Sequence, residues 1–410
     1  MPGPLEGVKV LEFSEMIAAP FAGMHLGDMG ADIIKVEPPG GEPWRLTSPF
    51  APTESRTFLA LNRNKRGLAI DLKQAAGQEV IHRLVRNMDV VIVNYRPDTP
   101  ARLGIDYETL SELRPGLIYV ENTFLGRRGP DAHRPGYDLA AQAATGLLVT
   151  AGRTDGDGLP LPITPAIADF ATGLTIASAV CAALFARQRT GEGQRIEASL
   201  LATSLALQGA TFMKIAADTN RPAADELAEL PEEDRRALAS YYRAYRTKDS
   251  MIAIACLTPV LRRKFAAAVE VEDARHSREL PRLSPESITI ARDFTAAVTK
   301  RMLERTTAEW LSVMDAAGVP AAPVNRATDL MDDPQVLAND LVVDLDHPVG
   351  GRLRMLGPII RMSATPTEAR TPPPTLGQHN DDILSELGYT GGEIEALRVQ
   401  GIVASGPPPR

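Results

Sequence analysis

A single acidic residue, Asp169, stands at the head of a long apolar stretch, in the sequence ITPAIADFATGLTIASAVCAALFARQRTGEGQ. If a helix begins near Pro165, Asp169 lies in its first turn, where the helix dipole stabilises a carboxylate. Asp is common at helix starts for that reason alone. A carboxylate beside small residues can also act as a nucleophile on a carbonyl carbon and form an acyl-enzyme. The spacing of the residues leaves both interpretations open.

A second group of polar residues follows the predicted strands. Glu37 comes after DIIKV, and Asn94, Tyr95 and Arg96 come after DVVIV, with Arg102 just beyond. Open α/β sheets bind ligands beyond the carboxyl ends of their strands, so these side chains are candidates for a ligand site. The NRNKRG loop at 62–67 adds three cations. Together with Arg96 and Arg102, the loop cations Arg63, Lys65 and Arg66 would form a basic rim suited to an anionic ligand, or else a set of separate solvated charges.

Several other chemistries lack their motifs. The first strand-to-helix turn reads EFSEMIAAPFAG and has no GxGxxG, and GxxxxGKS/T and GxSxG are also absent from the sequence. A dinucleotide fold, a P-loop and an esterase nucleophile elbow are therefore unsupported. No metal site is expected, because the histidines do not fall at metal-ligand spacing and no CxxC accompanies them: His25, His82, His133, His276, His347 and His379.

The elements that must position these residues follow from the pattern of hydrophobicity. In the first 125 residues, short β-branched runs alternate with helical stretches, which predicts an α/β fold with a parallel sheet flanked by helices. One helix is expected to begin near Pro20 and end at Gly30. A long Ala-rich helix is expected from Pro165 to Arg189, then the strand RIEAS, then a second helix from about Leu200 to Ala217.

A change in composition predicts the division into domains. Residues 1–217 form the large domain, and the polar, acidic segment 218–240 is the linker. Residues 241–328 form a smaller α+β domain with the strand MIAIACL and the helices PVLRRKFAAAV and TAAVTKRMLERTTAEWLSVMDAAG. Residues 329–410 form a second linker and a C-terminal segment, with a hairpin turning at 349–351, and 340–410 complete the large domain.

Composition excludes some partners. The formal net charge of -8 and the pI near 5.4 argue against a nucleic-acid partner. Cys181 and Cys256 lie in apolar segments, as small buried thiols usually do. The N-terminus lacks a signal-peptide pattern, and we find no run of about 18 apolar residues, so neither secretion nor a membrane is expected. We predict a cytoplasmic location.

The chain resembles the class III CoA-transferases, a group that includes formyl-CoA transferase and carnitine CoA-transferase and is related to α-methylacyl-CoA racemase. The matching stretches run in family order and include LEGVKVLEFSEMIAAPFAGMHLGDMGADIIKVEPPGGE, NRNKRGLAIDLK, DVVIVNYRPDTPARLGIDYETL, RRGPDAHRPGYDLAAQAATGLL and TLGQHNDDILSELGY. The resemblance implies that Asp169, in DFATG, is the catalytic carboxylate. It would attack an acyl-CoA thioester to give a mixed anhydride and then an aspartyl-CoA thioester. The implied substrates are an acyl-CoA and a small carboxylic acid, with no tightly bound cofactor and no metal.

The resemblance also implies which residues contact CoA. They are Ile17, Ala18, Ile70, Asp71, Leu72, Lys73, Asn94, Tyr95, Arg96, Arg102, Pro135, Gly136, Tyr137 and Asp138. In the family an Arg often follows the IKVE strand, whereas here Pro38 and Pro39 follow Glu37, so the adenine contact differs.

A racemase is the alternative function. Racemases of the family have Gly-His-Asp where this chain has Gly136, Tyr137 and Asp138, and exchanging an α-proton needs two acid/base groups. An ordinary Tyr, with a pKa near 10, is a poor substitute at neutral pH, so we favour the transferase. A CoA-binding protein without turnover is a third hypothesis. The resemblance further implies a Rossmann-like large domain with a parallel sheet, a smaller α+β domain, and an obligate, interlocked homodimer. In that dimer segment 218–240 and the arm TPPPTLGQ wrap the partner.

Overall fold

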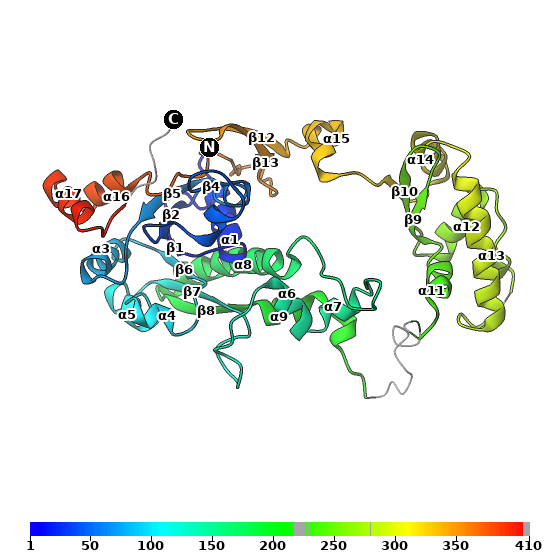
Figure 1. Ribbon diagram of the computed structural model, residues 1–410, viewed down its shortest axis with the longest axis horizontal. Coiled ribbons are helices and arrows are strands. Elements are labelled where there is room, and N and C mark those ends of the chain that lie inside the picture. Colours follow the sequence, from blue (N-terminus) through cyan, green and yellow to red (C-terminus); the bar gives the residue numbers. More distant parts are fainter. Residues whose placement is uncertain (217–226, 228, 279, 405–410) are drawn as a thin grey trace. The chain divides into compact units, whose positions relative to one another are not determined.

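The computed structural model describes residues 1–216, 227, 229–278 and 280–404 (Figure 1). These residues form two compact units. The first comprises Met1–Met213 and Pro334–Arg410, and the second Lys214–Asp333. Residues 218–226 and 228 of the predicted linker lie outside the described residues.

A six-stranded, fully parallel sheet forms the centre of the first unit. Its strand order is β5-β2-β1-β6-β7-β8, with β5 at Lys65–Ala69, β2 at Asp32–Glu37, β1 at Lys9–Phe13, β6 at Val90–Val93, β7 at Ile118–Thr123 and β8 at Gln194–Ser199. The predicted parallel α/β sheet is therefore confirmed. The chain adds β2 and β5 on one side of β1 and then β6, β7 and β8 on the other. The strand order thus reverses between β1 and β6, where α/β sheets form ligand crevices.

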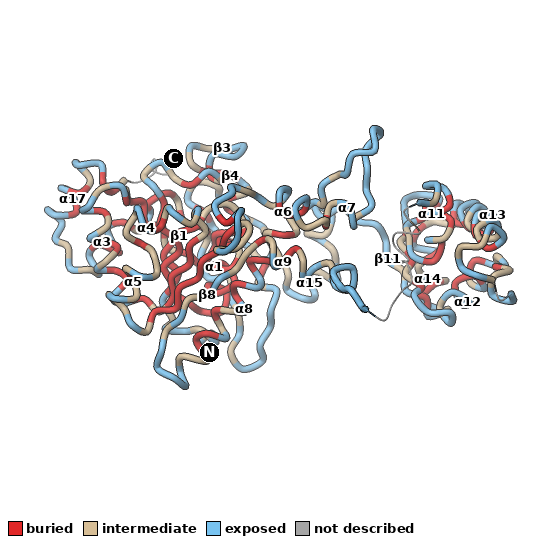
Figure 2. The backbone as a smooth tube through the Cα atoms, turned by 90° about the horizontal axis from the view of Figure 1, so that it is seen from below, coloured by how far each residue is buried: buried red, intermediate tan, exposed pale blue. Residues whose placement is uncertain are grey.

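Alternating strand residues bury both faces of this sheet, and Figure 2 shows its strands buried along most of their length, except the edge strand β8, whose residues are exposed or partly buried. Val10 and Ile92 face α1 (Ala18–Asp28) and α8 (Ile167–Thr190) in one core cluster. Leu11 and Val91 point the other way, toward helices of the opposite layer. That layer contains α3 (Ala75–Val85), α5 (Tyr107–Leu113), α16 (Asn380–Glu386) and α17 (Gly391–Val399). This strict alternation along a strand follows from the β-pleat.

The C-terminal segment is built into this same unit. Ile383, Leu397 and Val403 are buried in the core cluster around β1 and α3. The arm 371–378, which is predicted to wrap a partner, packs within this chain on β5 of its own unit. The main-chain N–H of Asn64 donates to the Thr371 carbonyl at 3.0 Å, and a Cβ on Gly67 would lie 3.2 Å from Pro374. The arm is therefore fixed by contacts within the chain.

The remaining elements of the first unit are short. They are η1 (Pro43–Leu46), β3 (Pro49–Ala51), β4 (Glu54–Ser55), α2 (Arg56–Leu59), α4 (Thr99–Arg102), α6 (Asp138–Ala144), α7 (Leu147–Thr150), α9 (Leu200–Leu207), η2 (Gly209–Phe212), α15 (Pro334–Ala338), and the hairpin of β12 (Val342–His347) and β13 (Gly351–Leu356). The helix expected from Leu200 to Ala217 ends at Leu207, because Gly209 takes a φ of +52°, outside the helical range.

The second unit is a small α+β unit with its own core. Its antiparallel sheet has the order β11-β10-β9, with β9 at Tyr242–Arg246, β10 at Met251–Ala255 and β11 at Ala321–Pro323. Among its described residues, the helices are α11 (Glu232–Leu238), α12 (Pro259–Ala268), η3 (Ala274–His276), α13 (Pro285–Met302), α14 (Thr307–Ala317) and η4 (Ala327–Asp332).

One helical stretch predicted in this unit is two helices. The chain breaks between α13 and α14, where Thr306 and Glu309 form a capping box that starts the second helix. Trp310 is fully buried, and its indole N–H donates to the Met302 carbonyl at 2.8 Å. The capping box starts α14, and this contact ties α14 to the end of α13.

Helix α8 is long and apolar. By length and composition it could span a membrane, since its most apolar 18-residue window has a mean hydropathy of 1.7. Its buried residues, including Ile176 and Val180, pack on α1 and the sheet. A core helix meets the same criterion, so the hydropathy of α8 is weak grounds for a membrane segment.

Candidate active site

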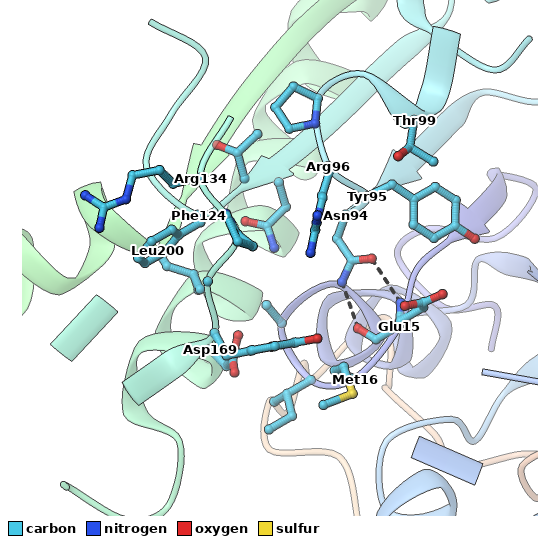
Figure 3. A pocket seen from close by; sticks show the side chains of 18 of the residues that line it. Glu15, Met16, Asn94, Tyr95, Arg96, Thr99, Phe124, Arg134, Asp169 and Leu200 are labelled. Atoms are coloured by element: carbon cyan, nitrogen blue, oxygen red, sulfur yellow. Dashed lines mark hydrogen bonds between the residues drawn. The ribbon is translucent and has the colours of Figure 1, made fainter. Parts of the chain in front are cut away.

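A cavity of about 430 Å³ opens at the point where the strand order reverses (Figure 3). It lies within the first unit, and its walls come from the segments after β1, β6 and β7, from the segment before α6, and from the starts of α8 and α9. Its lining residues are Glu15, Met16, Ile17, Ala18, Asn94, Tyr95, Arg96, Pro97, Thr99, Arg102, Asn122, Thr123, Phe124, Ala132, Arg134, Pro135, Gly136, Tyr137, Asp169 and Leu200.

Most of the predicted site residues meet in this cavity. Those that line it are Ile17, Ala18, Asn94, Tyr95, Arg96, Arg102, Pro135, Gly136, Tyr137 and Asp169. Residues 70–73 do not line it. Ile70 and Leu72 are buried, with Ile70 bridged to Val403, and the exposed Lys73 donates its main-chain N–H to the Asp71 carboxylate.

Asp169 lies in the first turn of α8, as the sequence predicted. The N-cap residue Ala166 has no side-chain acceptor, so the cap comes from α6 instead. The Asp138 carboxylate oxygen Oδ1 accepts hydrogen bonds from the main-chain N–H groups of Ala168 at 2.7 Å and Asp169 at 3.3 Å. Gln142 donates to the other oxygen of Asp138 and to the Ile163 carbonyl, which holds Asp138 in place. Asp138 itself does not line the cavity, so the structure shows it as the cap of α8.

The surroundings of Asp169 favour its neutral form. Burial and the nearby Asp138 carboxylate raise the pKa of Asp169 to about 7. Burial disfavours the charged carboxylate because it removes water, and Asp138 adds like-charge repulsion. A strongly raised pKa in a cavity is typical of a functional carboxylate.

The glycine of the DFATG stretch sets how closely α8 approaches α1. A Cβ on Gly173 would lie 2.6 Å from the Ala18 carbonyl oxygen and 2.9 Å from the Phe21 ring. Only a residue without a side chain permits this approach. The start of α8, with Asp169, is thus held beside Ile17 and Ala18.

The segment before α6 is held in a similar way. A Cβ on Gly136 would lie 2.3 Å from the ring of Phe124, which follows β7. The contact seats Pro135 and Tyr137 against the end of the sheet. Tyr137 is 68% exposed.

The turn after β1 forms another part of the cavity wall. Its backbone is bonded to Asn94, which accepts from the Glu15 N–H at 3.0 Å and donates to the Glu15 carbonyl at 2.7 Å (Figure 3). Asn94 thereby joins the ends of β1 and β6. Arg96, two residues on, extends toward the middle of the cavity (Figure 3). With Arg102 and Arg134, it gives the cavity a cationic character suited to an anionic ligand.

Three cations predicted for a basic rim are not part of the cavity. Arg63 is buried in an ion pair with Asp28 at 2.6 Å, and Lys65 in one with Glu12 at 2.9 Å. Arg66 pairs with Asp32 and Glu386. Residues 65–67 belong to β5 rather than to a loop, and both the rim and the solvated-charge interpretations are wrong for Arg63 and Lys65. Glu37 is also buried, in an ion pair with Arg45 at 2.7 Å.

Some lining residues had not been predicted. Phe124 and Leu200 directly follow β7 and β8, and Glu15 comes two residues after the end of β1, so the rule that ligands bind beyond strand ends could have found them. Arg134 carries no comparable signal. No cluster of three or more His, Cys, Asp or Glu side chains arranged for a metal ion occurs in the described part of the chain.

Comparison with known proteins identifies the family. The sequence model of CoA-transferase family III matches residues 5–380. The chain belongs to this family. As a class III CoA-transferase it is an enzyme that uses CoA thioesters as substrates, and the family membership expected from the resemblance is confirmed.

Relatives of known activity support this assignment. The chain is 35% identical to the mouse (Mus musculus) succinyl-CoA:glutarate CoA-transferase, over 98% of this chain and 90% of the relative. It is 33% identical to a succinate–glutarate CoA-transferase of Agrobacterium fabrum, over 94% of this chain and 96% of the relative. The crystal structure of a CAIB/BAIF family protein from Brucella suis superposes with a TM-score of 0.79 at 30% identity, covering 94% of this chain and all of that one.

Proposed function

We propose that this class III CoA-transferase moves CoA from an acyl-CoA donor to a carboxylic acid through covalent intermediates on Asp169. The observation that carries the proposal is the position of Asp169, a carboxylate with a pKa near 7 on the wall of a cavity with cationic side chains. Near neutral pH a large fraction of Asp169 is ionised and able to attack a thioester.

The steps balance without a further reactant. An Asp169 oxygen attacks the thioester carbonyl, the C–S bond breaks, and a mixed anhydride and CoA thiolate form. The thiolate attacks the aspartyl carbonyl, giving an aspartyl-CoA thioester and releasing the donor acid. The acceptor carboxylate then attacks the carbonyl of this thioester, expels the thiolate and forms a second mixed anhydride. Attack of the thiolate on the acceptor acyl carbon forms the new acyl-CoA and restores the Asp169 carboxylate.

The cavity cations support anionic substrates. Arg96, Arg102 and Arg134 can pair with the phosphates of CoA or with carboxylates, which match the planar guanidinium group. We include in this proposal the CoA contacts that the family resemblance implies. They include contacts by residues 70–73 and by Asp138. Succinyl-CoA and glutarate are the first donor and acceptor to test, because relatives act on them by name.

The test is to trap the intermediate. The protein is incubated with succinyl-CoA, treated with mild hydroxylamine and mapped by peptide mass spectrometry. A hydroxamate or CoA adduct on Asp169, absent from Asp169→Ala, is the expected result. Glu192→Gln, which removes an exposed acid outside the cavity lining, is the control and should keep the adduct. Transfer activity that survives in Asp169→Ala would contradict the proposal.

The same incubation in deuterium oxide tests the alternatives. A racemase would place deuterium at the α-carbon of a chiral acyl-CoA without net transfer of CoA. A binding protein would take up CoA and yield neither product. The relatives that bear the name of CoA-transferases support the first function over both.

We further propose that the protein is an obligate, interlocked homodimer whose domains follow the predicted division at 217, 240 and 328. Large apolar side chains stand exposed on the first unit, among them Phe185 at 61% on α8, Leu207 at 43% at the end of α9, and Phe212 at 66%. Patches of this kind mark interaction sites. Analytical ultracentrifugation should give a dimer that does not dissociate on dilution, and folded monomers would refute it.

A further inference from the structure

The turn Ser14–Met16 between β1 and α1 is held by buried charged side chains that do not reach the cavity. The Lys35 ammonium donates to the Ser14 carbonyl at 2.8 Å. On the other side of Glu15, the Met16 N–H donates to the Glu42 carboxylate at 2.8 Å. These two hydrogen bonds, together with the two between Asn94 and Glu15, fix the main chain of Ser14, Glu15 and Met16.

Lys35 and Glu42 also pair with each other. Their charged atoms lie 3.1 Å apart, and both side chains are essentially without solvent exposure. Lys35 further contacts Glu12 at 3.4 Å. A buried charge is tolerated only with a partner, so each member of this pair keeps the other in place. Glu42 is not among the residues that line the cavity.

Met16, in the middle of these contacts, has an unusual backbone conformation. Met16 has a φ of +67°, in the left-handed region that residues with side chains rarely adopt. Such a conformation persists only where the surroundings impose it. The next residue, Ile17, is the N-cap of α1 and provides no side-chain cap, so the cavity wall of Met16, Ile17 and Ala18 begins at this strained turn.

We infer that Glu42 is a positioning residue for CoA binding. Its carboxylate holds Met16 in the left-handed conformation through one oxygen and Lys35 through the other. The Glu42–Lys35 pair thereby sets the direction in which the first residues of α1 face the cavity. The inference rests on the proposed function only in that the ligand of this wall is taken to be CoA.

Three variants test it. Glu42→Leu removes both interactions of the carboxylate. Glu42→Gln offers one acceptor oxygen, which cannot serve the Met16 N–H and the Lys35 ammonium together. Asp28→Asn is the matched control. Asp28 is also a buried, ion-paired carboxylate, 2.6 Å from Arg63, but it lies at the C-terminal end of α1, away from the turn that Glu42 contacts. The dissociation constant for free CoA is measured by calorimetry, and thermal unfolding is followed alongside.

We expect Glu42→Leu to weaken CoA binding about tenfold and Glu42→Gln about threefold, because the strain at Met16 is then partly released. Asp28→Asn should unfold at a lower temperature and bind CoA as the unaltered protein does. In steady-state assays with succinyl-CoA, the Glu42 variants should raise KM more than they lower kcat. A simple loss of stability would not produce this split.

Two results would overturn the inference. One is a folded Glu42→Leu with unchanged CoA affinity, and the other is an equal loss of affinity in Asp28→Asn. Should Glu42→Leu not fold, an unchanged affinity in Glu42→Gln decides against it. CoA binding involves no covalent step, so Asp169→Ala should bind CoA normally. A failure of the covalent mechanism would therefore leave this measurement unaffected.

Discussion

The Asp138 carboxylate accepts a hydrogen bond from the main-chain N–H of Asp169 at 3.3 Å, and it also caps α8 through Ala168. Its charge contributes, after burial, to the raised pKa of Asp169. One acidic residue therefore positions the other and keeps its carboxyl partly protonated at neutral pH. In this chain Asp138, the last residue of the Gly136-Tyr137-Asp138 sequence, caps the helix that carries the candidate nucleophile.

Replacing Asp138 tests the electrostatic part of this relationship. Asp138→Asn keeps an acceptor oxygen for the Ala168 N–H but removes the negative charge. The pKa of Asp169 should then fall below about 7, and the rate of adduct formation should reach its half-maximum at a lower pH. A pH series of trapping rates measures this. Glu192→Gln, an exposed charge beyond the other end of α8, should leave the midpoint in place, and an unmoved midpoint in Asp138→Asn would contradict the assignment.

The raised pKa of Asp169 also predicts a cost in stability. The unfolded carboxyl ionises from a pKa near 3.8, whereas the folded one holds its proton to about pH 7, so folding stability falls as pH rises between these values. Asp169→Asn should therefore raise the free energy of unfolding by about 2 kcal/mol at pH 8, allowing for partial solvation. At pH 3.5 the gain should vanish. Urea unfolding at both pH values measures it, and an equal effect at the two would rule out this origin.

The contact at Gly173 makes a third prediction. Gly173→Ala places a methyl group against the Ala18 carbonyl, so α8 must move from α1. The free energy of unfolding should fall by about 1–3 kcal/mol, and adduct formation on Asp169 should slow. Ser178→Ala, at an exposed position of the same helix, should change neither. A Gly173→Ala protein of full stability and full activity would show that the two helices can separate without consequence.

Tyr137 separates the transferase from the racemase. If its ring only packs beside the ligand, Tyr137→Phe should keep CoA transfer within about threefold of the unaltered rate, since loss of a general acid or base costs about a hundredfold or more. Transfer between succinyl-CoA and glutarate is the assay. A loss of activity on that larger scale would assign a proton-transfer role to the hydroxyl group and revive the racemase mechanism.

The fold could be predicted to a large extent because its signals are local. The β-branched runs that became β1, β2, β6 and β7 are short and apolar, and the helices between them show their own periodicity. β5 was missed because it begins with Lys65 and Arg66, whose charges resemble a loop. Their partners, Glu12 and Asp32, are distant in sequence and come close only in the folded sheet. The capping box at Thr306 was a local signal that could have been recognised.

The sequence by itself determined the parallel α/β sheet, the position of Asp169 at a helix start and the membership of a CoA-transferase family. Only the tertiary structure decided that Asp138 caps the helix of Asp169 and that Arg63 and Lys65 are buried in ion pairs. It also decided that Glu42 holds the turn at Met16. Periodicity and motifs arise from neighbours along the chain, whereas the partner of a buried charge is chosen by which strands and helices the fold places side by side.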